Sequence, residues 1–115
     1  IFVVAEYNRS ITGALKNALD QAYKEWNRKA FTVIGYGGLG AARAVEHLRT
    51  IGIELQMVST RSGVHIGGGD FMTIFPMGGN QGMEAIESNL MPSATAALDE
   101  LAWWSKATMA ARAQG

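Results

Sequence analysis

The stretch from Phe31 to Gly40, FTVIGYGGLG, decides the fold class of this 115-residue chain. The run Phe31–Ile34 is apolar and β-branched, which predicts a buried strand. The glycines that follow predict a tight turn. After Gly40, apolar residues recur at helical spacing and predict an amphipathic helix. Its inner stripe is Ala41, Ala44, Val45, Leu48 and Ile51. A strand that leads through a turn into such a helix is one βα unit of an α/β protein.

Similar units lie on both sides of this one. Ile1–Ala5 is an apolar run typical of a parallel strand covered on both faces, and Leu55–Val58 predicts a third strand. Between the first two strands, Thr12 is a candidate N-cap for a helix. The inner stripe of that helix is Leu15, Ala18, Leu19, Ala22 and Trp26. Strands that alternate with helices imply right-handed crossovers, so we expect a parallel sheet with helices on both faces.

The second half of the chain is less regular. Residues 63–82 are rich in glycine, and we interpret them as a functional loop, a dimer arm or a variable surface excursion. A helical pattern resumes at Met83 and predicts a last helix that packs on the sheet beyond Pro92. Of the pair Trp103 and Trp104, we expect one side chain in the core and one at an interface. Because the sequence contains no repeat or linker, we expect residues 1–115 to form a single domain.

Composition excludes several functional classes. Hydrophobic residues make up 48% of the chain and charged residues 17%, which predicts a soluble globular protein. Ten basic residues balance ten acidic ones, so we expect no nucleic-acid or membrane partner. Cysteine is absent, and His65 has no second ligand at metal spacing, which argues against a metal site. We predict a cytoplasmic location.

Polar residues gather after the first strand, from Glu6 to Ser10. Because a parallel strand delivers its carboxyl end to the ligand crevice, this cluster predicts a binding loop. Asn8 can donate to and accept from a heterocycle edge, Tyr7 offers an aromatic face, and Glu6 can fix the loop by accepting backbone N–H bonds. The alternative is a solvated surface loop without a role.

The glycine turn has two interpretations. Gly35, Gly37 and Gly40 match G-x-G-x-x-G, the spacing of a dinucleotide-binding turn, although the next strand ends in Ser59-Thr60-Arg61 and carries no ribose-binding acid. The same glycines also suit a tight turn with close helix packing. Arg43, in the first turn of the helix, pairs with Glu6 or Glu46 or projects toward an anion.

The two loops together resemble a known family. Ala5-Glu6-Tyr7-Asn8-Arg9-Ser10-Ile11, then Gly13, then Leu15 to Asp20, is similar to the motif after the third strand of the NADPH-dependent FMN reductases, which are flavodoxin-like proteins. Tyr36 to Ala44 resembles the glycine-rich turn and helix start after that family's fourth strand. Ala5 and Thr12 stand where the family usually has proline.

The resemblance implies a site and a cofactor. The family's loops after strands three and four cradle the isoalloxazine ring of FMN. This assigns cofactor binding to seven residues, Glu6, Tyr7, Asn8, Ser10, Tyr36, Gly37 and Gly38. The implied reaction is NAD(P)H-dependent reduction of FMN and then of a small acceptor such as a quinone, with NADPH or NADH as hydride donor. We assign no catalytic side chain, because the cofactor carries the chemistry.

The resemblance also implies missing elements and an association. The family's first strand, phosphate loop, first helix and second strand have no counterpart here, so we interpret the chain as the C-terminal portion of a flavodoxin-like domain. Family members are commonly oligomers, and we expect a homo-oligomer, in the simplest case a dimer. The alternative is a non-enzymatic chain that completes its sheet with a separate partner.

Overall fold

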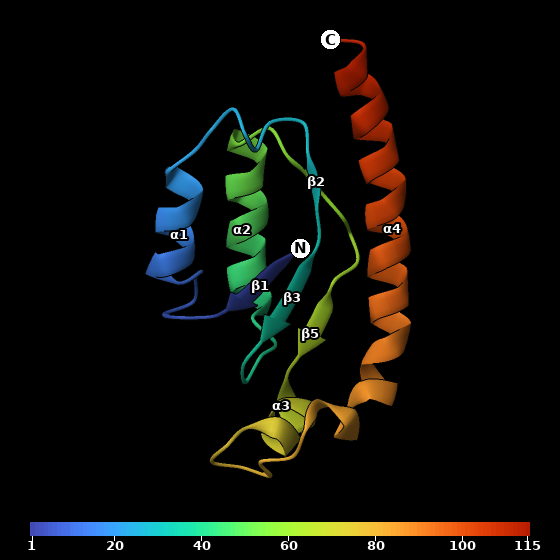
Figure 1. Cartoon of the computed structure of the whole chain (residues 1–115). Coiled ribbons are helices and arrows are strands. Elements are labelled where there is room, and N and C mark those ends of the chain that lie inside the picture. Colours follow the sequence, from blue (N-terminus) through green and yellow to red (C-terminus); the bar gives the residue numbers. More distant parts are fainter.

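The computed structural model describes all 115 residues and confirms the α/β class, with helices on both faces of a parallel sheet (Figure 1). The main sheet contains β1 (Phe2–Ala5), β3 (Val33–Tyr36) and β5 (Val64–Ile66) in the order β1-β3-β5. All of its pairings are parallel. This arrangement is the predicted flavodoxin-like one.

A short second ladder continues the sheet at its amino end. β2 (Ala30–Phe31) pairs in parallel with β4 (Val58–Ser59). The predicted strand Phe31–Ile34 is thus divided at Thr32, whose buried hydroxyl accepts a 2.8 Å hydrogen bond from that of Thr60. The predicted strand Leu55–Val58 was placed too early, because helix α2 extends to Glu54 and Leu55 is its C-cap.

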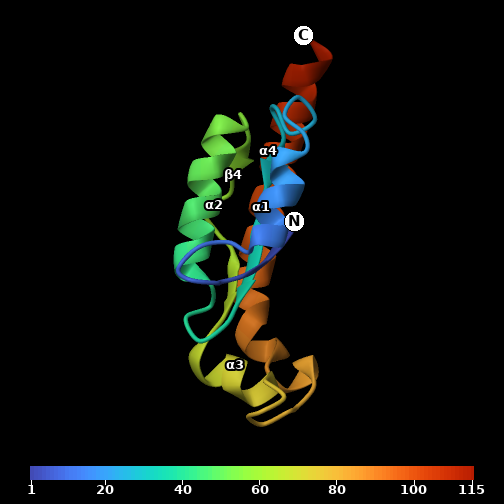
Figure 2. The same cartoon turned by 90° about the vertical axis from the view of Figure 1, so that its left-hand side faces the viewer.

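The larger core lies under α1 (Gly13–Asp20) and α2 (Ala42–Glu54), which share one face of the sheet (Figures 1 and 2). As predicted, the oxygen of Thr12 caps α1 by accepting from the amide of Leu15 at 3.1 Å. The predicted extension of this helix to Ala22 and Trp26 is wrong, since α1 ends at Asp20. The Trp26 indole instead packs beside the core and donates to the carbonyl of Leu19 at 3.0 Å.

The opposite face is covered by α4 (Glu87–Ala113), which confirms that the last helix packs on the sheet (Figure 1). The small core beneath it contains Val64, Ile66 and Ile86. Trp103 is exposed and Trp104 half-buried, with their rings edge to face at 4.8 Å, so the expectation that one belongs to the core is wrong. None of the helices is long and apolar enough to span a membrane.

Residues 63–82 have more structure than the sequence indicated. They contain β5 and the short helix α3 (Gly68–Ile74), and the 3₁₀ turn η1 (Met83–Ala85) follows. The segment after α3 folds back on it, with the amide of Gly79 donating to the carbonyl of Met72 at 2.8 Å and that of Gln81 to Thr73 at 3.0 Å. The segment is therefore an ordered edge strand, helix and return loop.

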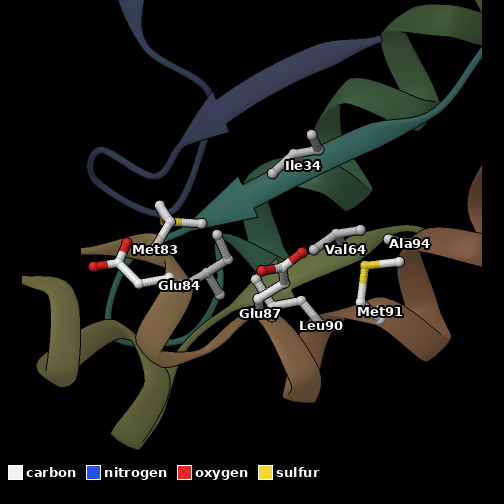
Figure 3. A pocket seen from close by; sticks show the side chains of 9 residues that line it. Ile34, Val64, Met83, Glu84, Glu87, Leu90, Met91 and Ala94 are labelled. Atoms are coloured by element: carbon white, nitrogen blue, oxygen red, sulfur yellow. The ribbon is translucent and has the colours of Figure 1, made fainter. Parts of the chain in front are cut away.

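Coverage of β1 is one-sided, contrary to the prediction. Val4 is buried against the larger core, but Val3 is 64% exposed, because α4 packs mainly over β5 and β2. Between β3, β5 and α4 lies a mainly apolar cavity of about 290 Å³ (Figure 3). Its lining is mainly aliphatic and includes Ile34, Val64 and Leu90, and Glu84 and Glu87 also contribute to it.

Candidate functional site

The sheet brings the two predicted binding loops to one edge. Ala5 and Tyr36 are register partners at the carboxyl ends of β1 and β3, so the loops that begin at Glu6 and Gly37 start side by side. All seven predicted site residues lie on these loops or at the end of β3. The edge is open to solvent, and none of the seven lines the apolar cavity next to α4.

The first loop contains a tight two-residue turn. The amides and carbonyls of Tyr7 and Ser10 exchange hydrogen bonds of 2.9 and 3.0 Å. Asn8 and Arg9 between them have φ values of 51° and 70°, the left-handed conformations of a type I′ turn. Asn8 suits such a position, and Tyr7 is 66% exposed. The turn therefore presents an aromatic face and an amide to solvent, which fits both the predicted binding loop and the alternative of a solvated surface loop.

The carboxylate of Glu6 is hydrogen-bonded to the start of helix α2. Its Oε1 atom accepts hydrogen bonds of 3.0 Å from the amides of Arg43 and Ala44, and its Oε2 atom accepts from Arg43 Nε at 2.9 Å. The bonds from the Arg43 guanidinium, together with those from the two amides, lower the pKa of Glu6 against a smaller opposing contribution from burial. Glu6 thus caps α2, which has no side-chain cap of its own.

This contact decides between the alternatives left open for Arg43 and for the glycine motif. Arg43 pairs with Glu6, whereas Glu46 pairs with Arg49. A dinucleotide turn would place a pyrophosphate on the free amides at the start of the following helix. At α2 two of these amides are bonded to Glu6. The structure therefore argues against direct dinucleotide binding by the G-x-G-x-x-G turn.

The glycines in β3 and in the second loop have different roles. A Cβ on Gly35 would lie 2.4 Å from the carbonyl oxygen of Gly40, so this position requires glycine for packing. Gly37 has a φ of 139°, which requires glycine for its backbone. In contrast, a Cβ on Gly38 would meet nothing within 4 Å. The amides of Gly38 and Leu39 donate to no protein group, so the turn offers open space and two free donors.

Two histidine contacts at this edge were not predicted. His47 Nδ1 lies 2.9 Å from the hydroxyl of Ser10, and His65 Nδ1 lies 2.7 Å from the carbonyl oxygen of Gly40. No motif in the sequence marks His47 as a site residue. The available signal was its position on α2, one turn after Arg43, but the pairing joins residues 37 positions apart.

Both loops lie in a segment that matches a known protein family. A model of the NADPH-dependent FMN reductase family matches residues 1–70, which include both loops. The chain is 35% identical over 60 residues to an NAD(P)H-dependent FMN reductase of Saccharomyces cerevisiae, and this match covers 50% of the chain and 31% of the relative.

Quinone reductases are also among the relatives. The chain is 44% identical over 61 residues to an NAD(P)H:quinone oxidoreductase of Solanum tuberosum, a match that covers 50% of the chain and 31% of the relative. It is 40% identical over 65 residues to a 2-hydroxy-1,4-benzoquinone reductase of a Burkholderia species, with 50% and 36% covered. The chain thus matches about a third of the length of these relatives.

Proposed function

The chain belongs to the NADPH-dependent FMN reductase family, and we propose that its two carboxyl-edge loops hold the isoalloxazine ring of FMN in an NAD(P)H-dependent oxidoreductase. The observation that carries the proposal is the convergence of the Tyr7–Ser10 turn and the Gly37–Gly40 turn at the ends of paired strands. Ligands of open α/β sheets bind at this edge.

The residues fit a flavin ring system. Its dione edge needs hydrogen-bond donors, and the amides of Asn8, Arg9, Gly38 and Leu39 donate to no protein group. A planar ring also needs space close to the backbone. The missing Cβ atoms of Gly37 and Gly38 leave that space, because a Cβ at either position would meet nothing within 4 Å.

Each loop also supplies one exposed aromatic side chain. Tyr7 follows β1, and Tyr36, which is 41% exposed, ends β3. Aromatic faces of this kind stack on planar ligands. The Asn8 amide makes no hydrogen bond within the protein and is available to the polar edge of a ring. Glu6 has a different task, since both of its oxygens hold α2.

The chemistry that FMN supplies when bound is two-electron redox exchange, with NAD(P)H as donor and a small molecule as acceptor. The residues of this chain position the ring and leave one side of the edge open for the second reactant. We propose a quinone as acceptor, because the names of several relatives specify quinone reduction. No side chain at the edge is assigned to proton transfer.

The exposed apolar surface of β1 favours association as a second element of the proposal. Val3 of the edge strand β1 is 64% exposed, and Ile1, which precedes this strand, is 62% exposed. Such surface is unusual on a monomer, and we propose that the chain forms a homo-oligomer. If the chain binds no flavin, the same surface favours the alternative function of an interaction chain that pairs with a partner.

Titration of FMN into the chain, followed by flavin fluorescence, tests the site. Asn8→Ala is expected to weaken FMN binding by about 1–3 kcal/mol, the usual cost of removing one partner from a buried polar contact. Asn80→Ala is the matched control, because Asn80 is also an exposed asparagine with a left-handed backbone, at φ 49°. It is expected to leave the affinity unchanged.

Two outcomes of this titration distinguish an error in the assignment of Asn8 from an error in the proposed binding site. An Asn8→Ala variant with unchanged affinity would remove Asn8 from the binding surface. A parent chain that binds no FMN at micromolar concentration would contradict the proposed function as a whole.

A further inference from the structure

We propose that His47 is a positioning residue that fixes the Tyr7–Ser10 turn through the hydroxyl of Ser10. Its effect on flavin binding rests on the function proposed above, whereas its effect on the turn does not. The observation behind it is the 2.9 Å contact between His47 Nδ1 and Ser10 Oγ, which joins the middle of α2 to the last residue of the turn.

The turn has few other anchors. The side chains of Tyr7, Asn8 and Arg9 make no hydrogen bond or ion pair within the protein, and all three are exposed. The two hydrogen bonds between Tyr7 and Ser10 close the turn but do not attach it to anything else. Its orientation over the sheet edge must therefore come from the residues at its two ends.

Both ends are attached to α2. Before the turn, Glu6 binds the amides of Arg43 and Ala44 at the start of the helix. At its end, Ser10 contacts His47, which lies one helical turn beyond Arg43 on the same side of α2. After the turn, Ile11 is buried in the larger core. Without the His47 side chain, the Ser10 end of the turn is held only by the burial of Ile11 in the larger core.

The contact leaves Ser10 able to serve a ligand as well. A serine hydroxyl has one donor and two acceptor positions, and the imidazole of His47 occupies one of them. His47 itself need not touch the ligand for the turn to depend on it. This is why we classify it as a positioning residue.

Trypsin cleavage after Arg9 measures the order of the turn without any flavin. Proteolysis requires local opening, so a loosened turn is cut faster. In the flavin-free chain, His47→Ala is expected to accelerate cleavage at Arg9 on the order of threefold to tenfold, the factor that corresponds to one hydrogen bond. Cleavage at the exposed Lys24, in the same digest, is the internal reference and should not change.

Two further variants separate positioning from general stability. His47→Asn keeps a polar atom near the place of Nδ1 and is expected to restore most of the protection of Arg9. Thr50→Ala is the matched control, because Thr50 is exposed on the next turn of α2 and its hydroxyl bonds only to the carbonyl of Glu46. Thr50→Ala should be cleaved at Arg9 at the parent rate, and cleavage at Lys24 should be the same in all three variants.

The double variant Ser10→Ala with His47→Ala tests whether His47 acts on the turn through Ser10. If His47 acts through Ser10, the His47→Ala change adds nothing to the cleavage rate of Ser10→Ala. Equal acceleration in both backgrounds would overturn the proposal, as would parent-like cleavage of His47→Ala.

FMN titration of the same variants measures how the position of the turn affects FMN affinity. His47→Ala is expected to weaken FMN binding on the order of threefold to tenfold, with recovery in His47→Asn. If the parent chain binds no FMN, the proposed function fails, but the trypsin experiment still decides whether His47 holds the turn.

Discussion

The two faces of the sheet differ in how well they are packed. On the α1 and α2 side, ten buried residues form one continuous core, and the 13-residue helix α2 alone buries four of its residues. On the other side, three buried residues form the core, and the 27-residue helix α4 buries only Ala97. The proposed flavin turns are attached to the well-packed face.

This difference has a physical reason and a functional consequence. A binding loop must be held within a fraction of an ångström, which needs neighbours whose own positions are fixed by packing. Helix α2 satisfies this requirement, because Val45 and Leu48 anchor it while Arg43 and Ala44 hold the Glu6 carboxylate. We therefore expect stability and binding to depend strongly on the α2 face and weakly on the α4 face.

The largest expected effect compares one leucine on each face. Leu48→Ala empties a fully buried site and should lower the free energy of unfolding by about 3 kcal/mol. Leu90→Ala, on the half-buried α4 side, should lower it by about 1 kcal/mol, since its site is open to solvent. Urea unfolding followed by circular dichroism measures both. Equal losses would show that the two faces contribute alike.

A smaller loss of stability is expected from substitutions at Gly35 and Gly38. Gly35→Ala places a methyl group against the Gly40 carbonyl and should cost about 2 kcal/mol of stability through overpacking. Gly38→Ala meets open space and should change stability by less than about 0.5 kcal/mol.

Gly38→Val tests whether the open space next to Gly38 holds the flavin ring. It should abolish flavin binding and leave the helical circular dichroism signal intact, because its side chain fills the space proposed for the ring. A Gly38→Val variant that binds FMN normally would show that the turn is only structural.

The sequence predicted the well-packed face better than the other. The stripe of α2 was correct at Ala44, Val45 and Leu48, because a buried helix face leaves a clear 3.6-residue period. On the other side, β5 was missed, because three residues set among glycines give no periodic signal. Trp26 was assigned to α1 by its spacing alone, although the helix ends six residues earlier.

The juxtaposition of the two loops was predictable from the sequence, but their contacts were not. Adjacent strand ends follow from the parallel order of the sheet, so the cluster after β1 and the turn after β3 could be placed together. The pairing of Glu6 with Arg43 was one of three open alternatives, and the contact of Ser10 with His47 had no local signature. Contacts across 37 residues depend on the packing of α2, which periodicity does not specify in such detail.

The smallest expected loss of stability at neutral pH comes from neutralising one carboxylate on each face of the sheet. Glu6 binds the start of α2, and Glu100 of α4 accepts from the amides of Arg61 and Ser62 at 2.7 and 2.9 Å. The bonds from these two amides lower the pKa of Glu100, and the Arg43 contact lowers that of Glu6. Their stabilisation is complete above the unfolded value near 4.5 and is lost as the pH falls through the lower folded value.

Glu6→Gln and Glu100→Gln test this sign. Each variant should be less stable than the parent at pH 7, and the gap should close as the pH falls below about 4.5. Thermal unfolding between pH 3 and pH 7, with the ranges chosen to bracket that value, measures the gap. Only Glu6→Gln should also weaken FMN binding, since only Glu6 supports the Tyr7–Ser10 turn. A gap that widens in acid would contradict the assigned direction of the pKa shifts.

Hydrogen–deuterium exchange with and without FMN tests whether the carboxyl-edge loops hold the flavin, because it monitors both faces of the sheet in one experiment. FMN is expected to slow exchange at residues 6–10 and 36–41 and to leave exchange at residues 83–98, around the apolar cavity next to α4, unchanged. Protection confined to residues 83–98, with none at the two turns, would contradict the assignment of the carboxyl-edge loops as the flavin site.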